Sequence, residues 1–278
     1  MFRAKKYYSH GFTLIELAVV LLILGALFAG ILIPFTTQVE LRRVADTQKT
    51  LVEIREALIG FAAAKGRLPC PASVASNGQE AFVNPPIDDE KNGRCKNFLD
   101  GFVPAAVLGI GPTDGAGYVL DAWNNRIRYA VTDADRSAIG SPTPTNSNTY
   151  FDFTGLGPVA AANGEMRNVG MSVLNPNLHV CSTATGISAN ACAAGTALID
   201  NAVAVIYSIG PNASRADPGG LRRDENANPN PNLNDNNPSF VSHDRAGENN
   251  PNGEFDDIVI WLSPNILYAK MIAAGRLP

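Results

Sequence analysis

The longest hydrophobic segment of the chain lies close to its N-terminus. From Phe12 to Ile33 every residue is apolar or small except Thr13 and Glu16. A helix rises ~1.5 Å per residue, so this segment would be ~33 Å long, which is about the thickness of a bilayer core. The residues before it include three basic side chains and no acid, a distribution that holds this end in the cytoplasm. The pattern predicts one membrane-spanning helix followed by an exported body.

A second, amphipathic helical pattern follows Pro34. Apolar residues recur at spacings of 7, 3, 4 and 3, which places them on one helix face: Val44, Leu51, Ile54, Leu58 and Phe61. Gly66 gives a C-terminal stop. We therefore expect one helix from Phe12 to about Lys65, with its first half in the membrane and its second half packed on a globular body. Gly25 and Pro34 should soften it, because proline removes a backbone hydrogen bond, and Pro34 also marks the membrane exit.

Beyond residue 66 the pattern predicts short strands between long polar loops. Three segments have the composition of strands: Ile127–Val131, Ala202–Ile209 and Asp256–Leu262. A short helix from Asn265 to about Ala274 should follow, because Ser263-Pro264 fits a helix start. Residues 133–201 are weakly patterned and residues 211–256 are polar and rich in asparagine, so we expect both to be loops. The predicted fold class is α+β, a long helix packed on a small antiparallel sheet with loop insertions.

Glu16 is an anomaly within the apolar segment. A carboxylate is costly there, and no Lys or Arg follows until Arg42. Residues Gly11–Glu16, GFTLIE, resemble the type III signal of type IV prepilins and type II secretion pseudopilins. The resemblance implies a pilin-like fold, cleavage by prepilin peptidase between Gly11 and Phe12, and N-methylation of Phe12. It also implies that Glu16 faces the N-terminal ammonium of a neighbouring subunit during assembly, which would compensate its charge.

This resemblance divides the chain into a leader, a transmembrane and assembly helix, an amphipathic helix and a periplasmic pilin-like domain with two insertions: residues 1–11, 12–33, 34–66 and 67–278, with insertions at about 133–201 and 211–256. It implies a structural, minor subunit of a type IV pilus or a type II secretion pseudopilus in a Gram-negative-type bacterium. The subunit would first span the inner membrane and then join a periplasmic or extracellular filament. Its partners would be prepilin peptidase, other pilin or pseudopilin subunits, the inner-membrane assembly platform, and membrane lipid before assembly. The alternative is a membrane-anchored periplasmic ectodomain that binds a ligand or catalyses a reaction and never polymerises.

Charge and motif content exclude other classes of function. The formal net charge is −4, and removal of residues 1–11 would make it −7 because three basic residues leave with them. An acidic body without a basic stripe argues against nucleic acid as the main partner. The sequence has no HExxH, no phosphate-binding loop and no dinucleotide fingerprint. We therefore expect a peptidase substrate rather than an enzyme.

The four cysteines lie beyond the apolar segment, and an even number in an exported chain favours disulfides. They are Cys70, Cys95, Cys181 and Cys192. Three connectivities exist, and we favour the pairing of nearest neighbours, which is Cys70–Cys95 with Cys181–Cys192. The alternative is that the cysteines bind zinc, but the sequence has no CxxC and only His179 lies close to a cysteine.

Two C-terminal segments are similar to the major pseudopilin of type II secretion. The first has Asp121, Trp123, Asn125 and Tyr129 at the positions of its turn and strand. Asn124 replaces a glycine, and asparagine tolerates the positive φ of such a turn. The second begins at Tyr207–Gly210, YSIG, passes through a polar loop and reaches Asp256, Asp257, Ile258 and Trp261.

That protein binds calcium in the corresponding loop, so the resemblance implies a Ca²⁺ site here. Asp256 and Asp257 are the implied ligands, with Asp244, Glu248 and Asn252 as further candidates. An EF-hand does not fit, because Pro229 stands where its loop needs glycine. The alternative is a solvated polar loop that holds no metal.

Overall fold

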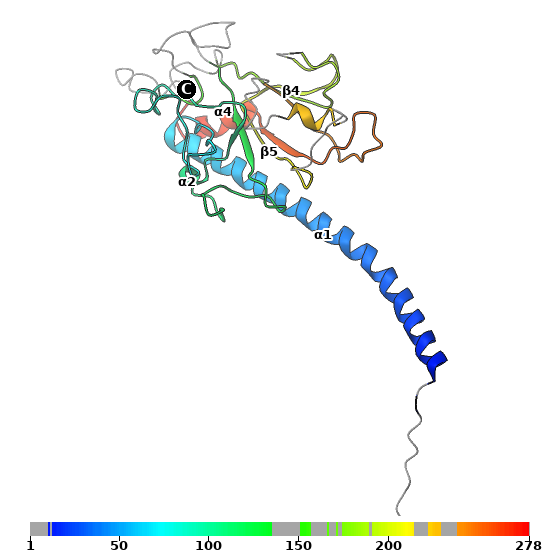
Figure 1. Cartoon of the computed structure of the whole chain (residues 1–278). Coiled ribbons are helices and arrows are strands. Elements are labelled where there is room, and N and C mark those ends of the chain that lie inside the picture. The colour runs from blue at the N-terminus through cyan, green and yellow to red at the C-terminus, as the bar shows by residue number, and fades with distance from the viewer. Residues whose placement is uncertain are drawn as a thin grey trace, which may run out of the picture. The chain divides into compact units, whose positions relative to one another are not determined.

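The fold is described by a computed structural model, which covers residues 11, 13–134, 151–156, 166, 171, 174–188, 191–213, 222–228 and 238–277, with the backbone alone at 26–36. Its elements, in chain order, are α1 Leu14–Lys65, β1 Gly101–Phe102, α2 Ala105–Leu108, β2 Arg128–Val131, β3 Leu178–Cys181, β4 Ala197–Ala202, β5 Ala204–Ser208, η2 Glu225–Ala227, β6 Ser239–Val241, β7 Ile258–Leu262 and α4 Pro264–Ala273. Figure 1 shows them along the chain.

The chain forms two compact units, residues 1–45 and residues 46–278. α1 begins in the first unit and ends in the second, and the helix continues through Gly25 and Pro34. The predicted extent of one long helix to Lys65 is therefore confirmed. Among the described residues, no helix is long and apolar enough to cross a membrane.

The second unit is built around the C-terminal half of α1. Leu51, Ile54 and Leu58 are fully buried, so the predicted apolar face is the buried face. α4 lies beside the end of α1 (Figure 1), and the Arg276 side chain that follows α4 donates hydrogen bonds to the backbone carbonyls of Ala63 and Ala64. Carbonyls at a helix C-terminus have no partner within the helix, so this arginine caps the end of α1.

A four-stranded antiparallel sheet lies next to this helix. Its strand order is β1-β2-β5-β7, and β2 pairs with β5 and β5 with β7 in regular register. The three predicted strands correspond to β2, β5 and β7, shorter by one or two residues at their ends. Pro264 occupies the first turn of α4 after Ser263, as the sequence predicted.

A second sheet corrects the prediction that residues 133–201 and 211–256 are loops. β3 and β4 lie in the first of these segments and β6 in the second, and together they form a three-stranded sheet of order β4-β3-β6. The β3–β6 pair is parallel, so the fold has two sheets, one of them mixed. The other described residues of both segments, apart from η2 and the helical residue Met166, are turns, bridges and irregular chain.

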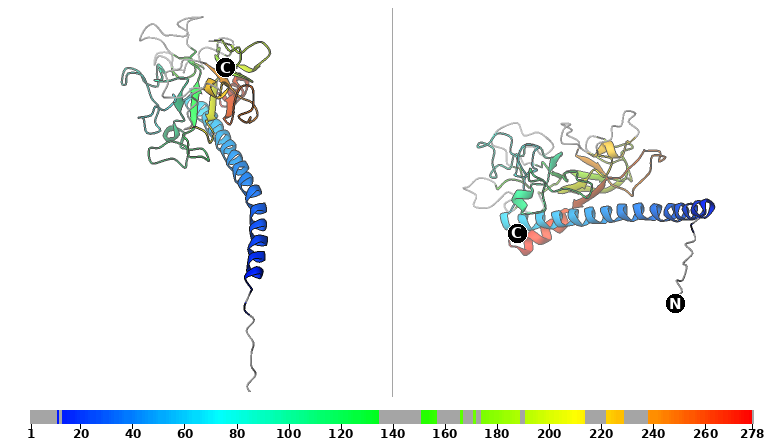
Figure 2. Two further views of the ribbon diagram at one scale, coloured as in Figure 1. Left: turned by 45° about the vertical axis from the view of Figure 1, so that its right-hand side comes forward. Right: turned by 60° about the horizontal axis from the view of Figure 1, so that its bottom comes forward.

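The two sheets share one hydrophobic core. Tyr207 and Val205 of β5 pack with Phe240 of β6 and with Leu178 and Val180 of β3, and the rings of Tyr207 and Phe240 lie 5.6 Å apart. Successive residues along β2, β5 and β7 point to opposite faces of the first sheet. One face packs on this core, and the C-terminal half of α1 runs along the other face (Figure 2). The inserted sheet is therefore a third layer on the globular unit.

Two disulfides close loops in this unit. Cys70 is bonded to Cys95 and Cys181 to Cys192, which is the nearest-neighbour pairing. The first bridge holds the irregular segment that follows α1. The second joins the end of β3 to the loop before β4, so it closes the loop of the inserted β3–β4 hairpin.

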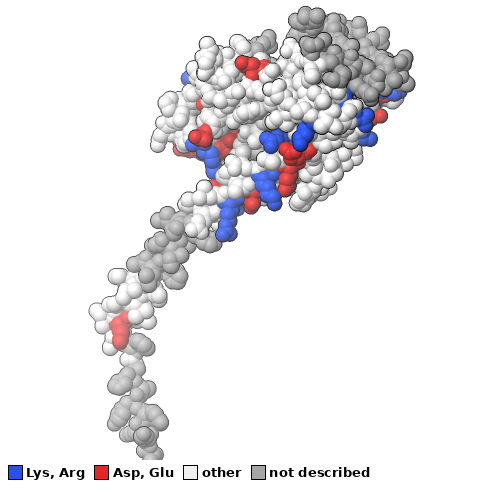
Figure 3. Space-filling model, turned by 180° about the vertical axis from the view of Figure 1, so that it is seen from behind, with Lys and Arg blue, Asp and Glu red and all other residues white. Residues whose placement is uncertain are grey.

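Charged side chains of both signs are interspersed on the face of the molecule drawn in Figure 3. The charged side chains of α1 include the pairs Lys49–Glu53 and Arg55–Glu56, at 3.8 Å and 3.6 Å. Whether nucleic acid is a partner stays a prediction from the sequence.

Candidate functional sites

The start of α1 is fixed by a reciprocal cap between Thr13 and Glu16. The Glu16 backbone N–H donates to Thr13 Oγ1 at 3.3 Å, and the Glu16 carboxylate lies 3.5 Å from the Thr13 backbone nitrogen. This is the capping box, in which the first residue of the cap and the third residue of the helix satisfy each other's N–H groups. Glu16 is exposed, and its hydrogen bonds with Thr13 give it a local structural role in the isolated chain. Its assembly role stays a prediction.

The structure places the other residues predicted for processing and for softening of the helix as follows. Gly11 is exposed and lies outside the helix, and Gly25 is an exposed residue within it. Phe12, the predicted methylation site, lies outside the described residues, as does the side chain of Pro34. Among the described residues no basic side chain lies beside Glu16, and its pairing with the ammonium of a neighbouring subunit stays a prediction.

The two C-terminal segments singled out in the sequence meet in the second unit. Asn124 has φ +69°, so the turn has the positive φ that we expected asparagine to tolerate. Asp121 accepts hydrogen bonds from the backbone N–H groups of Trp123 and Asn125. Its other oxygen accepts one from the Ser208 hydroxyl at 2.6 Å, and Asn125 donates to the Gly210 carbonyl at 2.7 Å. The predicted turn therefore supports the end of β5.

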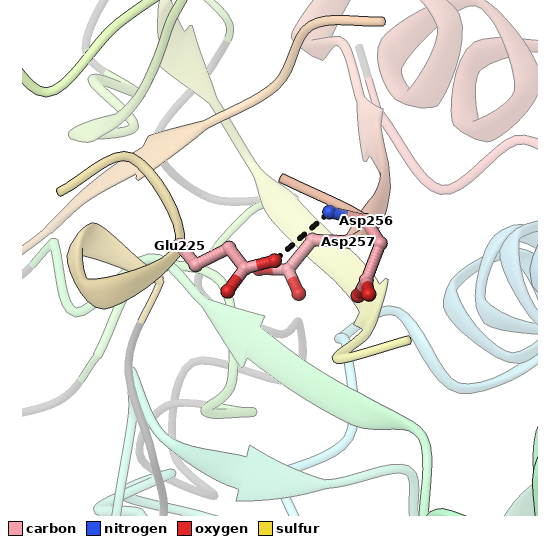
Figure 4. Close-up of side chains that lie close together, drawn as sticks. All are labelled: Glu225, Asp256 and Asp257. Carbon is pink, nitrogen blue, oxygen red and sulfur yellow. Dashed lines mark hydrogen bonds between the residues drawn. The ribbon is translucent and has the colours of Figure 1, made fainter. Parts of the chain in front are cut away.

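Directly beside Gly210 lies a cluster of three carboxylates, from Glu225, Asp256 and Asp257. One oxygen from each lies within 4.8 Å of the others. Figure 4 shows the Glu225 and Asp257 carboxylates side by side, and the hydrogen bond from the Asp256 backbone N–H to Glu225, 2.9 Å long. η2 supplies Glu225, and the residues just before β7 supply the two aspartates. Exposed fractions of 9%, 4% and 6% place all three side chains inside the protein.

Among the described residues, the three carboxylates of the cluster have two cationic side chains near them, Arg222 and Arg245. Arg222 forms an ion pair with Glu225 at 3.2 Å, and Asn212 donates to the same carboxylate. Burial, followed by the nearby Glu225 charge, raises the pKa of Asp256 to about 7. Burial also raises the pKa of Asp257 well above its ordinary value, although a hydrogen bond from Asn228 opposes the increase. Each of these aspartates therefore favours the binding of a proton or a cation.

One carboxylate oxygen of the cluster is buried without a hydrogen-bond partner among the described residues. This is Asp256 Oδ1. It lies against the Cα of Gly210, so closely that a Cβ at residue 210 would collide with it. Gly210 has φ +64°, which glycine adopts without strain. The absence of a side chain at residue 210 thus makes room for the Asp256 carboxylate.

The structure brings together two of the five predicted calcium ligands. Asp256 and Asp257 lie together, whereas Asp244 and Glu248 are exposed and are not members of the cluster. The Asn252 side chain contacts the hairpin loop: its amide donates to Thr183 Oγ1, and its oxygen accepts from the Thr185 hydroxyl. Glu225, which the sequence analysis missed, completes the group.

The chemistry of this cluster fits a hard divalent cation. All three side chains offer anionic oxygen, the ligand type that Ca²⁺ and Mg²⁺ prefer, and Ca²⁺ accepts irregular geometry and backbone or amide oxygens in addition. An orphaned buried carboxylate oxygen is costly unless it meets a donor or a metal. Glu225, Asp256 and Asp257 are therefore the residues that could hold such an ion.

Fold and sites together define an α+β protein whose long N-terminal helix starts directly after a short basic segment. Comparison with protein families identifies that start: residues 6–32 match the prokaryotic N-terminal methylation motif, the prepilin-type signature. This confirms the resemblance at Gly11–Glu16 and points to a processed, pilin-like structural protein rather than an enzyme. The match does not extend to the C-terminal segments that resemble the major pseudopilin. No curated protein and no solved structure matches the chain.

Proposed function

We propose that the chain is a minor structural subunit of a type IV pilus or a type II secretion pseudopilus. The observation that carries this proposal is the methylation motif at residues 6–32, placed at the start of a 52-residue helix. Prepilin peptidase would cut between Gly11 and Phe12, and Phe12 would become the methylated N-terminus. The inserted sheet supports the choice of a minor subunit, because it enlarges the body beyond a helix packed on one small sheet.

The composition of the first half of α1 supports assembly through this helix. Leu14, Ile15 and Leu22 are 88%, 75% and 72% exposed in the isolated chain. A side chain of this size gains ~1.5–3 kcal/mol when it is fully buried. A bundle of such helices would provide that burial, and lipid would provide it before assembly, so the helix can pass from membrane to filament at little cost.

Glu16 would select the axial position of each incoming subunit. Its carboxylate would leave the Thr13 cap, or share it, and pair with the Phe12 ammonium of a neighbour. An unpaired charge among apolar helices is strongly disfavoured. Staggers that leave Glu16 without a partner would therefore be rejected.

We also propose that Glu225, Asp256 and Asp257 bind one Ca²⁺ ion in the globular unit. Support comes from the buried Asp256 Oδ1, which has no hydrogen-bond partner among the described residues, and from the excess of negative charge in the cluster. The ion would neutralise the two buried aspartates and hold η2 against the start of β7. The exported location that we propose matches the weak sites of extracellular modules, which bind calcium at ~10⁻⁴–10⁻³ M.

Intact-mass measurement with N-terminal sequencing tests the processing step. The chain is expressed with an active prepilin peptidase, whose activity is verified on a second prepilin in the same cells. We expect a product that begins at methylated Phe12, and a Gly11→Val control that remains at full length because the bulky side chain blocks the cut. A chain that still begins at Met1 would overturn the filament proposal and favour a membrane-anchored ectodomain.

A further inference from the structure

One short segment among the described residues contacts both the acidic cluster and the inserted sheet. This segment, residues 222–228, is called the connector below, and it contains η2. Three of its side chains point to three different parts of the globular unit. Asp224 contacts the disulfide-closed hairpin, Glu225 belongs to the acidic cluster, and Asn228 contacts β6.

Asp224 fixes the connector to the β3–β4 hairpin. It is 3% exposed, and its Oδ1 accepts hydrogen bonds from the Ala184 backbone N–H at 2.6 Å and from the Thr183 hydroxyl at 3.1 Å. Its Oδ2 lies 3.2 Å from His243 Nε2. Thr183 and Ala184 are the second and third residues after Cys181, so Asp224 is hydrogen-bonded to the hairpin inside the loop that the disulfide closes.

Asn228 joins β6 to the cluster. Its side-chain oxygen accepts the Val241 N–H at 2.8 Å, and its amide donates to the Val241 carbonyl at 3.2 Å. The same amide donates to Asp257 Oδ2 at 2.5 Å. One buried side chain thus continues the backbone hydrogen bonding of β6 and orients a carboxylate of the cluster.

These contacts cannot be altered independently, because they belong to a connector of seven residues built around one helical turn. If Glu225 moves away from Asp256 and Asp257, the neighbouring Asp224 is displaced from Ala184. If the hairpin leaves Asp224, the anchor that holds Glu225 in the cluster is weakened. Two sites that share one rigid element are energetically coupled, and the coupling is the same in both directions.

We propose that divalent cation binding at Glu225, Asp256 and Asp257 controls how firmly the disulfide-closed loop of the β3–β4 hairpin is held at Thr183 and Ala184. This inference rests on the proposed Ca²⁺ site and adds a role to it. With the ion bound, the connector is held in place and the hairpin is fixed through Asp224. Without the ion, the connector loses this anchor, and Thr183 and Ala184 are released from Asp224, while β3 stays in the core and the disulfide keeps the loop closed. The loop surface around Ala184 is then ordered only where calcium is abundant.

Hydrogen exchange on the full chain in detergent micelles, with Ca²⁺ as the only added ligand, tests this proposal. Peptides that contain Ala184 should exchange about 5–10-fold more slowly with Ca²⁺ than with EDTA, the lower end of the range for coupled sites. By reciprocity, Asp224→Asn should weaken Ca²⁺ binding by about the same factor, although Asp224 is not one of the three proposed ligands. The matched control is Asp200→Asn, on β4 of the same sheet and outside the connector, and it should bind Ca²⁺ like the wild type.

The outcomes separate the two proposals. If the wild-type chain binds no Ca²⁺ at millimolar concentration, the ion site is wrong and the inference falls with it. If Ca²⁺ binds and Asp257→Asn abolishes binding, but exchange near Ala184 is the same with Ca²⁺ and with EDTA, the site stands and the coupling is overturned. The wild-type exchange measurement decides this even if Asp224→Asn does not fold.

Discussion

The two halves of α1 contain the same kinds of side chain in opposite environments. Leu51, Ile54 and Leu58 are fully buried, whereas Leu14, Ile15 and Leu22 are mostly exposed. The C-terminal half finds its apolar partners within the chain. The N-terminal half has no such partners among the described residues. Both halves are helical, and what distinguishes them is whether the chain supplies its own partner surface.

The largest effect is expected at Glu16. Glu16→Ala removes both its cap and its charge, whereas Glu16→Gln keeps the capping box, because Gln serves as well as Glu at this position. We expect both variants to lose filament assembly, since the pairing with a neighbour's ammonium needs the charge. Electron microscopy of sheared filaments measures this. Thermal unfolding of the globular unit should be unchanged in both. If Glu16→Gln assembles like the wild type, Glu16 acts through its cap alone.

Leu58→Ala and Leu22→Ala test the difference between the halves directly. Leu58 is fully buried, so its truncation should lower the free energy of unfolding by ~2–5 kcal/mol. Leu22 is 72% exposed, and its truncation should change that free energy by less than ~0.5 kcal/mol. Urea unfolding of the full chain in detergent measures both. Equal losses would contradict the claim that only the C-terminal half belongs to the folded core.

Gly210→Ala should be the next most damaging change, and it acts on the globular unit alone. The added methyl group would collide with the Asp256 carboxylate, at a φ of +64°. The left-handed backbone costs ~1–2 kcal/mol for a residue with a Cβ, and the collision should add to this and weaken Ca²⁺ binding. Calorimetric titration and thermal unfolding measure the two effects.

Gly109→Ala is the matched control for this change. Gly109 has φ +67°, but its added methyl group would meet no atom of the described residues within 4 Å, its chain neighbours apart. It should therefore lose stability by the backbone cost alone and bind Ca²⁺ like the wild type. If both alanine variants bind Ca²⁺ equally well, Asp256 is not a ligand.

The smallest effect is expected from Asp114→Asn. Burial alone would raise the pKa of Asp114, but hydrogen bonds from the Tyr118 backbone and from Arg126 outweigh it and lower the pKa. A lowered pKa stabilises the fold above the unfolded value of ~3.9, and this contribution disappears as the pH falls through the folded pKa. The ion pair with Arg126 is partly exposed, so the difference from wild type at pH 7 should be less than ~1 kcal/mol and should decrease as the pH falls below the unfolded pKa. Denaturant unfolding at several pH values measures it.

Predictions from the sequence succeeded where a pattern was long or where residues close in sequence determine the structure. The buried face of α1 was predictable because its period is sustained over several turns. The strands β2, β5 and β7 were predictable because each is apolar and ends at turn residues. The cap at Thr13 and Glu16 also involves neighbours three residues apart, and the Thr-x-x-Glu spacing is its signal in the sequence.

The inserted sheet could not be predicted in the same way. β6 has three residues, which is too short to establish a period. β4 is mostly exposed and therefore lacks the alternation of a half-buried strand. Glu225 was missed because it lies 31 residues from Asp256 in a tract where many side chains offer oxygen. Only the fold selects which of these oxygens meet.

The Thr13–Glu16 cap also determines where α1 begins. The first helical residue is Leu14, and Gly11 lies outside the helix. A peptidase has to reach the carbonyl of the bond that it cuts, and within a helix that carbonyl would be engaged in the ladder of hydrogen bonds. By stopping the helix at Thr13, the cap leaves the Gly11 carbonyl free of that ladder. In the proposed subunit, the two side chains that begin the helix would thereby also mark, within two residues, the predicted cleavage site between Gly11 and Phe12.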